Sequence, residues 1–314
     1  MSDPFPVIEV PIDASQDIED LGTKEKFWFT DPNLGLCLFK KARLNTGEDW
    51  AEKIASELCE LLGVPHANYE LATFNGENGI ISPSFIPESS LELDNENSRT
   101  YREYETSLGN DILAETVSNY PKHLKNPSQH TIENVFDAIG NSTANLPINW
   151  TPPDGITTAV ETFVGYLLLD AWIGNSDRHH ENWALIRKAD KSDTYLAPTY
   201  DHASSMGREL RDNKRKSKLD NQSVIGYVEK CSSVLYASVN DSTTLKTVEA
   251  FREAKQRYLN AGNLWLDNLA KVSSNDTLEI FERIPSDRIS PTAIEFAQKI
   301  LELNQNRLLI LKEN

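Results

Sequence analysis

Cysteines are few in this 314-residue chain, and none has a close partner in the sequence. The three that occur, Cys37, Cys59 and Cys231, form no CxxC pair, which excludes a metal cluster built from neighbouring cysteines. A small, odd number of cysteines also fits a reducing compartment, where structural disulfides are rare. The sequence therefore predicts a cytoplasmic protein whose fold depends on a hydrophobic core.

Long apolar runs and an excess of basic residues are absent too. The longest apolar candidate, residues 163–173, is interrupted by Gly165 and Asp170 and falls short of the ~20 residues that span a bilayer. The first residues show neither the basic nor the apolar segment of a signal peptide. Against 48 acidic residues stand 31 basic ones, and the net charge of −17 argues against a general nucleic-acid binder. We expect no membrane contact and no direct DNA binding.

The composition is that of a globular protein, 39% hydrophobic, and the length suggests about two lobes. Apolar runs bounded by turn residues predict four short strands in the first part of the chain. Between the second and third strands, Thr46 and Asp49 have the spacing of a capping box, and an apolar stripe predicts a helix that Gly63 ends. The predicted strands are residues 27–29, 34–41, 69–74 and 80–86, the last two joined by a turn at residues 75–79.

The remainder of the chain is predicted to be mostly helical. It consists of a polar stretch (87–155), an apolar helix (158–173), two short strands (183–186 and 194–196) and a helical C-terminal part. The sequence thus predicts an α+β protein with a small β-rich N-lobe, residues 1–88, and a larger helical C-lobe, residues 89–314. A cleft between two lobes is a common place for a ligand.

Two polar segments carry the chemistry that the sequence offers. The first, Gly-Asn-Ser-Asp-Arg-His-His-Glu-Asn at residues 174–182, lies between the apolar helix and an apolar strand. Burying so many polar groups is costly unless they are paired or used. The second follows the next strand and ends on Tyr200 and Asp201. An Asp just past a strand can point its carboxylate into a cleft, so we expect the two segments to share a site.

Phosphoryl transfer needs groups of these kinds. It takes a base for the attacking hydroxyl, oxygen ligands for Mg²⁺ and a cation for the phosphates. Asp177 and Asn182 are five residues apart, as are the Asp and Asn of the protein-kinase catalytic loop, and Asp201 follows 19 residues later. The His-Arg pair that precedes the Asp in that loop is missing, since Arg178 and His179 follow it here.

Asn-Ser-Asp-Arg-His-x-x-Asn, followed by Leu-Ala-Pro-x-Tyr-Asp, resembles the signature of the HipA family of bacterial serine/threonine kinases. These are the toxin halves of HipA/HipB-type toxin–antitoxin modules. The resemblance implies a two-lobed protein-kinase-like fold of the HipA/PI3-4-kinase-related kind. It also implies that Asp177 is the catalytic base, that Asn182 and Asp201 hold Mg²⁺, and that His179 and Tyr200 lie beside the nucleotide.

An upstream glycine-containing segment extends the resemblance. Gly22, Thr23, Lys24 and Lys26 belong to a stretch similar to the family's phosphate-binding loop, Gly-x-x-x-Lys ahead of a strand. Glycine lets the backbone approach a phosphate closely, and backbone amides supply donors. By itself this segment is a weak signal, because surface turns often have the same composition.

The resemblance continues through the predicted strands and helix. Lys40, at the end of an apolar strand, matches the lysine that contacts the phosphates and joins Asp177 and His179 in the catalytic set. Glu52 or Glu57 in the next helix could pair with Lys40, and spacing leaves the choice open. Phe85 and Ile86 match the hinge whose backbone holds the adenine.

The chain also departs from the family pattern. Members often carry a longer N-terminal subdomain, whereas here the phosphate loop begins near residue 20. Longer members have an autophosphorylated Ser three positions before the loop glycine, and this sequence has Glu19 there with Asp20 beside it. We therefore expect this control site to be absent or replaced by fixed negative charge.

A basic run follows Asp201, where kinases have an activation loop. Residues 208–218 contain six basic and two acidic residues. We interpret the run either as a solvated loop or as a surface that contacts an acidic substrate or RNA bound to it. In the second case, reversing Lys214, Arg215 and Lys216 to Glu would impair substrate phosphorylation and spare ATP binding.

Other interpretations of the same residues stay open. The acids and amide of the two segments could form a structural turn. Adjacent histidines rarely converge on one metal and no H-E-x-x-H occurs, which disfavours a zinc site. The residues that such a site would use are His179, His180, Glu181 and His202.

The sequence thus predicts an ATP- and Mg²⁺-dependent serine/threonine protein kinase. By analogy its substrate is a translation factor such as an aminoacyl-tRNA synthetase, and its partner is a small helix-turn-helix antitoxin. The alternatives are a lipid or small-molecule kinase on the same fold, a nucleotide-binding pseudokinase, and a transferase that moves AMP.

Overall fold

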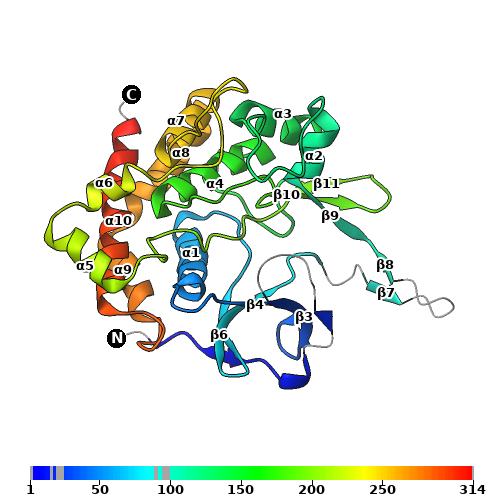
Figure 1. Ribbon diagram of the computed structural model, residues 1–314. Coiled ribbons are helices and arrows are strands. Elements are labelled where there is room, and N and C mark those ends of the chain that lie inside the picture. Colours follow the sequence, from blue (N-terminus) through cyan, green and yellow to red (C-terminus); the bar gives the residue numbers. More distant parts are fainter. Residues whose placement is uncertain (1–2, 15–16, 19–24, 88–90, 94–99, 313–314) are drawn as a thin grey trace.

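The computed structural model describes residues 3–14, 17–18, 25–87, 91–93 and 100–312. The predicted phosphate-loop residues Gly22, Thr23 and Lys24, and the acidic pair Glu19 and Asp20, lie outside the described residues. Figure 1 shows strands β3, β4 and β6 on one side of helix α1 and helices α4, α7 and α8 on the other.

The first part of the chain builds a six-stranded sheet in the order β1-β5-β6-β4-β3-β2. Neighbouring strands are antiparallel except for β1 and β5, which run parallel. Helix α1 (Glu48–Leu62) crosses between the fourth and fifth strands along the chain. The strands are β1 (Val7–Glu9), β2 (Asp17–Ile18), β3 (Lys26–Asp31), β4 (Gly35–Lys41), β5 (Glu70–Phe74) and β6 (Glu77–Pro83).

The two faces of β3 and β4 carry different side chains. An aromatic cluster covers the face away from α1, and it comprises Phe27, Phe29, Phe39 and Phe74. Because successive residues of a strand point to opposite faces, Lys40 points towards α1. Lys26 lies directly opposite Lys40 in the register, so its side chain shares that face.

The hairpin of β5 and β6 is tighter than predicted. Its turn consists of Asn75 and Gly76 alone, both at positive φ (51° and 74°), and β6 begins at Glu77. Two-residue turns of this kind match the right-handed twist of the strands they join. The prediction of a longer turn over residues 75–79 is therefore wrong, although the hairpin itself is confirmed.

The N-terminal cap of helix α1 lies one residue later than predicted. The cap is Gly47, and Thr46 Oγ1 instead donates to the carbonyl of Arg43 at 2.7 Å. The predicted capping box is wrong: the Asp49 carboxylate instead accepts a hydrogen bond from Nη1 of Arg288, far along the chain, at 3.1 Å. The end of the helix is as predicted, since Gly63 takes the left-handed conformation at φ 73°.

The second part of the chain is mainly helical, with a three-stranded sheet in the order β11-β10-β9. Its strands are β9 (Tyr104–Leu108), β10 (Ala184–Lys188) and β11 (Thr194–Leu196), and a separate hairpin pairs β7 (Leu91–Leu93) with β8 (Thr100–Arg102). The helices are α2 (Gly109–Thr116), α3 (Ile132–Asn141), α4 (Ala159–Ile173), α5 (Asp212–Asp220), α6 (Val224–Val228), α7 (Thr247–Arg257), α8 (Leu259–Lys271), α9 (Ser274–Glu282) and α10 (Pro291–Leu309), with short 3-10 turns at Ile12–Ala14 and Ile310–Lys312.

Several of these elements, among them strand β9 and helix α2, were not predicted, and one helix replaces a predicted loop. Strand β9 and helix α2 lie in the polar stretch where apolar periodicity is weak, and most side chains of β9 are exposed or half-buried. Helix α5 occupies the basic run that was expected to be a loop. None of the described helices has both the length and the apolar character that crossing a membrane requires.

Helix α4 lies at the centre of the helical part. Thr158 caps its start in a capping box with Glu161, and Gly174 ends it at φ 67°. One hydrophobic core runs from α1 through α4, because Ile54 of α1 and Leu168 of α4 belong to the same buried cluster. The loop that follows α4 therefore leaves from a rigid, fully packed element.

A buried ion pair fastens that loop to α4. The Asp170 carboxylate, within α4, accepts 2.8 Å bonds from Nε and Nη2 of Arg178 and another from Asn175 Nδ2. Arg178 is 1% exposed, and its Nη1 also donates to the carbonyls of Asn182 (2.6 Å) and Tyr200 (3.4 Å). One guanidinium thus ties together the helix, the loop and the segment that ends at residue 201.

We expect Asp170→Ala to destabilise the protein strongly, because it leaves the buried Arg178 guanidinium without its anion. Removing one partner of a buried pair costs about 3–5 kcal/mol. Urea unfolding followed by circular dichroism measures this loss. Asp111→Ala is the matched control, since Asp111 pairs with Lys122 at the surface and its removal should cost about 0–1 kcal/mol. Equal losses for the two variants would contradict the structural role of Asp170.

A second prediction concerns acid. Burial, helped by the nearby His180, lowers the pKa of His130 to about 3. Its Nδ1 lies 3.2 Å from the Val234 carbonyl, and its Nε2 accepts from Trp183 Nε1 at 3.4 Å. The folded protein therefore keeps this ring neutral, while the unfolded chain takes up a proton as the pH falls through about 6.5.

Stability should consequently fall on acidification. Between about pH 7.5 and about pH 5.5 His130 alone removes ~1.4 kcal/mol from the free energy of unfolding. The pKa values of His66, His179 and His180 are also lowered, mainly by burial, so they act in the same direction. Urea titrations at both pH values test this. His130→Gln should be less stable at neutral pH but show a smaller loss on acidification, and an unchanged slope would refute the assignment.

Candidate functional site

Lys40 lies in an acidic corner between the sheet and the helical part. Its Nζ is 3.7 Å from Asp201 Oδ1. Burial alone would lower the pKa of Lys40, but the charges of Asp201, Glu52 and Glu48 outweigh burial and raise it. Lys40, Glu48, Glu52 and Asp201 line one small cavity of about 10 Å³, close to the space that a single water needs. The corner therefore holds a charged ammonium against several carboxylates.

Of the two glutamates of α1 that could pair with Lys40, the structure places Glu52 near it and Glu57 away from it. Glu52 is buried and lines the corner, where its carboxylate accepts the backbone N–H groups of His202 (2.7 Å) and Ala203 (2.9 Å). Glu57 instead pairs with Lys53 at 2.8 Å. Glu52 therefore lies near the Lys40 ammonium and also binds the backbone just past Asp201.

Asp201 has an unusual backbone conformation. Its φ is +60°, which few residues other than glycine adopt, and such strain is typical of functional loops. The peptide N–H of Asp201 donates to Tyr69 Oη at 3.2 Å. Just upstream, backbone bonds join Thr199 to Pro65 and Ala67 at 3.0 and 2.9 Å. The segment between α1 and β5 therefore clamps the chain on which Asp201 projects.

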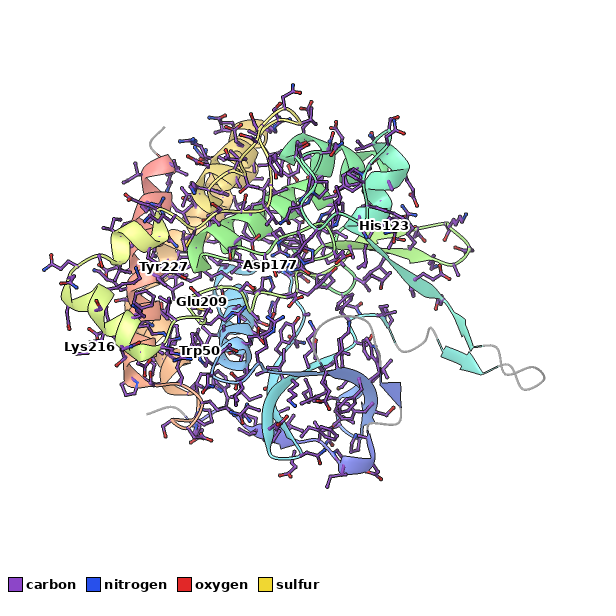
Figure 2. All side chains as sticks on the ribbon, in the orientation of Figure 1. Trp50, His123, Asp177, Glu209, Lys216 and Tyr227 are labelled. Atoms are coloured by element: carbon purple, nitrogen blue, oxygen red, sulfur yellow. The ribbon has the colours of Figure 1, made fainter. Side chains whose placement is uncertain are left out.

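Asp177 lies in the loop after α4, and its side chain is 31% exposed. Figure 2 shows it near the middle of the molecule. Its Oδ1 is 3.3 Å from Nζ of Lys125, and its backbone N–H donates to Asn175 Oδ1 at 3.2 Å. Lys125 was not predicted as a site residue, because it belongs to the polar stretch and no motif marks it.

The orientation of the Asn182 amide suits a cation ligand. Its Nδ2 donates to the Asp177 carbonyl at 2.7 Å, and its backbone N–H donates to the His179 carbonyl at 2.8 Å. With the nitrogen held in the loop, Oδ1 is the atom left for a metal, and carboxylate and amide oxygens are the donors that Mg²⁺ prefers. Among the described residues no three His, Cys, Asp or Glu side chains are grouped to hold a metal. Asn182 Oδ1 and the Asp201 carboxylate thus offer oxygen donors of the kind that Mg²⁺ prefers, and a complete coordination shell would need further ligands from outside the protein.

His179 belongs to the first polar segment, two residues after Asp177. Burial lowers its pKa, Lys125 acts in the same direction, and the charges of Asp177 and Asp201 oppose them. Its Nδ1 accepts the N–H of Glu181 at 3.2 Å. The net lowering of its pKa favours the neutral imidazole at neutral pH.

The other histidines considered for zinc have separate surroundings. His180 Nδ1 lies 2.7 Å from Tyr120 Oη. His202 is fully buried, with its Nε2 2.8 Å from Thr199 Oγ1 and its Nδ1 3.5 Å from Glu52 Oε1. Each of these rings has a local partner within the fold.

The predicted hinge residues lie at the junction of the two sheets. Phe85 packs both on the cluster that contains Ile80 of β6 and on the cluster that contains Ile186 of β10. Its ring stacks on Tyr200, with centroids 6.0 Å apart and planes at 21°. Tyr200 Oη donates to the Glu181 carbonyl at 2.8 Å, and the Ile86 N–H donates within its own turn. Phe85 and Tyr200 thus form one wall beside the acidic corner.

The basic run divides into residues with different surroundings. Arg208 donates to Glu48 Oε1 at 2.8 Å, and Arg215 is buried, with bonds to Asp212 and to the Gly207 carbonyl. Reversing Arg215 would therefore disrupt packing, so the triple reversal suggested by the sequence is an unsuitable test. Lys216 lies at the outer edge of α5, remote from Asp177, as Figure 2 shows.

No protein-family model matches the sequence, and no curated protein matches it. Solved structures do match it. The Helicobacter pylori proinflammatory kinase CtkA superposes with a TM-score of 0.71 at 17% identity, over 98% of this chain and 97% of that one. A chain of the Shewanella oneidensis toxin–antitoxin complex of HipA, HipB and operator DNA superposes with a TM-score of 0.58 at 12% identity, over 95% of this chain and 68% of that one. Likeness at such identities concerns the fold alone, and it confirms the predicted α+β, two-lobed, protein-kinase-like fold.

Proposed function

We propose that this chain is an ATP- and Mg²⁺-dependent kinase that transfers the γ-phosphoryl group to a Ser or Thr hydroxyl of a protein. The observation that carries the proposal is the ion pair between Lys40, on the sheet, and Asp201, on the loop beyond β11, at 3.7 Å. It joins a cation for phosphates to a metal-binding carboxylate across the two parts of the fold, as phosphoryl transfer requires.

Each residue has a definite task under this proposal. Lys40 binds the phosphates, and Glu52 positions both Lys40 and the backbone that follows Asp201. Asn182 Oδ1 and the Asp201 carboxylate hold Mg²⁺, which neutralises charge on the phosphates when it is bound. Phe85, Ile86, His179 and Tyr200 border the nucleotide, and Gly22, Thr23, Lys24 and Lys26 supply the phosphate loop.

Asp177 is assigned to the acceptor hydroxyl. Its carboxylate accepts the hydroxyl proton as the hydroxyl oxygen bonds to the γ-phosphorus and the bond from that phosphorus to ADP breaks. Lys125, whose Nζ is 3.3 Å from Asp177 Oδ1, is placed to stabilise negative charge on the transferred group. The loop supplies the base while a separate segment supplies the cation.

The biological setting is proposed from the motif and from the fold. The resemblance in residues 174–201 and the likeness to a HipA–HipB complex support a toxin kinase with a small helix-turn-helix antitoxin. On this reading the protein is cytoplasmic, and its substrate is a translation factor such as an aminoacyl-tRNA synthetase. These statements rest on analogy of fold and motif.

We expect Asp177→Asn and Asp201→Asn each to lower phosphoryl transfer by at least about a hundredfold, because positioning and charge stabilisation supply most of the catalysis. Both side chains are partly exposed, at 31% and 38%, so the variants should fold. Radiolabelled ATP with Mg²⁺ and cell lysate measures transfer. Expression of the wild type should slow growth, and expression of Asp177→Asn should not.

Asp111→Asn, a surface change outside the site, is the control for these two variants. Wild-type turnover by either site variant would refute its role. Label appearing in lipid or metabolite extracts rather than in protein would favour the alternative substrate classes. ATP-dependent thermal stabilisation without any transfer would indicate a pseudokinase.

The two glutamates of α1 provide a second test. Glu52→Gln should lower transfer by about tenfold or more, because the residue contacts the backbone past Asp201 and lines the corner of Lys40. Glu57→Gln, in the same helix, should change transfer by less than about twofold, since Glu57 pairs with Lys53 away from that corner. Kinetic assays with melting curves separate loss of activity from loss of fold. A larger defect in Glu57→Gln would overturn the choice of Glu52.

A further inference from the structure

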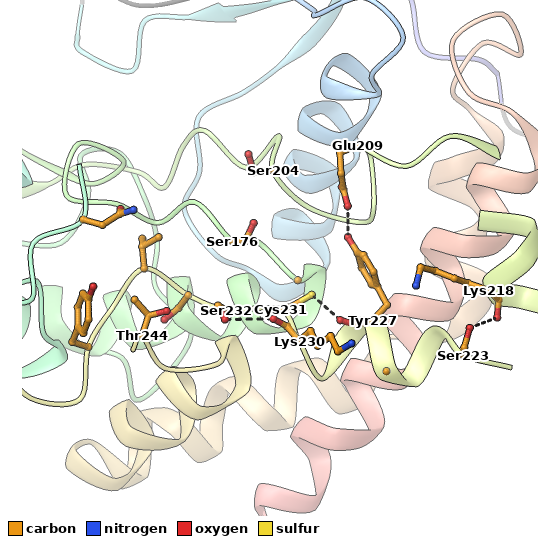
Figure 3. A pocket seen from close by; sticks show the side chains of 16 residues that line it. Ser176, Ser204, Glu209, Lys218, Ser223, Tyr227, Lys230, Cys231, Ser232 and Thr244 are labelled. Atoms are coloured by element: carbon orange, nitrogen blue, oxygen red, sulfur yellow. Dashed lines mark hydrogen bonds between the residues drawn. The ribbon is translucent and has the colours of Figure 1, made fainter. Parts of the chain in front are cut away.

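A polar cavity of about 650 Å³ opens beside the loop that carries Asp177. Figure 3 shows Ser176 and Ser204 along one side of it and Ser232 and Thr244 along the other. Its volume lies in the range of ligand-binding pockets, and most of the labelled residues on its walls carry a hydroxyl group. This lining suits an occupant with many hydrogen-bonding groups.

The cavity is continuous in sequence with the proposed transfer site. Ser176 on its wall precedes Asp177 directly, and Asn126 on its wall follows Lys125. Lys125 and Asp177 are the two residues that meet at 3.3 Å. Ser204 follows Asp201 by three positions, and its carbonyl accepts the Ser176 N–H at 3.1 Å. The cavity therefore lies next to the loop to which the acceptor hydroxyl is assigned.

The charged side chains of the cavity are mainly cations. Lys218 and Lys230 line it, and Lys246 donates from behind to Ser232 Oγ at 2.9 Å. The acidic side chain of the wall, Glu209, accepts the Tyr227 hydroxyl at 2.9 Å. In a protein with a net charge of −17, two lysines against one glutamate make this cavity more positive than the protein as a whole, which favours an anionic ligand.

The structure also shows which part of the basic run has this role. Arg208 and Arg215 are engaged in the fold, and Lys216 pairs with Asp220 at 3.2 Å. Lys218, two residues further along α5, lines the cavity, and its Nζ is 5.7 Å from the Tyr227 ring. The aromatic ring attracts the ammonium and so helps to hold it at the cavity wall.

We propose that this cavity binds the acceptor segment of the protein substrate, and that Lys218 and Lys230 select a segment whose Ser or Thr is flanked by acidic side chains. The inference rests on the proposed kinase function. An extended chain brings unpaired backbone N–H and C=O groups, which the hydroxyl-rich walls can satisfy. The lysines then add charge complementarity, which favours the correct partner and disfavours basic segments.

The test compares two short fluorescent peptides, each with a central serine, one flanked by glutamates and the other by lysines. Binding to the full chain is measured by fluorescence anisotropy, and transfer is measured with ATP and Mg²⁺. We expect the acidic peptide to bind and react preferentially. The double variant Lys218→Glu, Lys230→Glu should weaken its binding by roughly tenfold and raise its KM similarly.

A matched double variant, Lys271→Glu with Lys299→Glu, makes the same change in net charge at two lysines that do not line the cavity, and it should behave as the wild type. Transfer to both peptides without acidic preference, or a preference that survives Lys218→Glu, Lys230→Glu, would overturn the inference and leave the kinase function standing. Binding of the acidic peptide with no transfer to any protein or peptide would overturn the kinase function and, with it, the acceptor assignment. Tighter binding of single-stranded RNA at the same lysines would also overturn the inference.

Discussion

The proposed site depends on one buried ion pair. Arg178 and Asp170 are 1% and 3% exposed, so neither charge is solvated, and breaking the pair would leave an uncompensated charge inside the protein. The pair survives because its bonding is complete. The carboxylate receives both the guanidinium and the Asn175 amide, and the guanidinium reaches two backbone carbonyls. This geometry orients the loop of Asp177 relative to α4 without using the side chains assigned to chemistry.

A second set of charged side chains, on α1 and β4, holds the six-stranded sheet against the segment that follows β11. Glu52 and Glu48 both lie on α1, and they reach the segment past Asp201 through backbone amides and through Arg208. Lys40 approaches the same segment from β4. The side of α1 that faces α4 is held by apolar packing, whereas its side towards Lys40 is held by charges. Changes at Glu52 or Glu48 would therefore alter the relation between Lys40 and the segment that carries Asp201.

Much of the local structure could be predicted from the sequence. The apolar helix ending at Gly174, the strand at residues 194–196 and the left-handed end of α1 at Gly63 depend on neighbours a few positions apart, and periodicity reports such neighbours. The spacing of Asp177, Asn182 and Asp201 likewise placed two polar loops after buried elements. The predicted capping box at the start of α1 was wrong because Arg288, far along the chain, binds the Asp49 carboxylate.

The sequence by itself therefore determined that a β-rich part precedes a helical part and which residue types could perform phosphoryl transfer. Tertiary structure alone decided that Glu52 rather than Glu57 lines the corner of Lys40, that Lys125 lies against Asp177, and that Asp170 anchors the loop instead of merely interrupting an apolar run. It also decided that Arg215 turns inward while Lys218 faces a cavity. Each of these outcomes is a contact between segments far apart in the chain or a choice of helix face, and neither composition nor spacing encodes which distant partner an ionised side chain will meet.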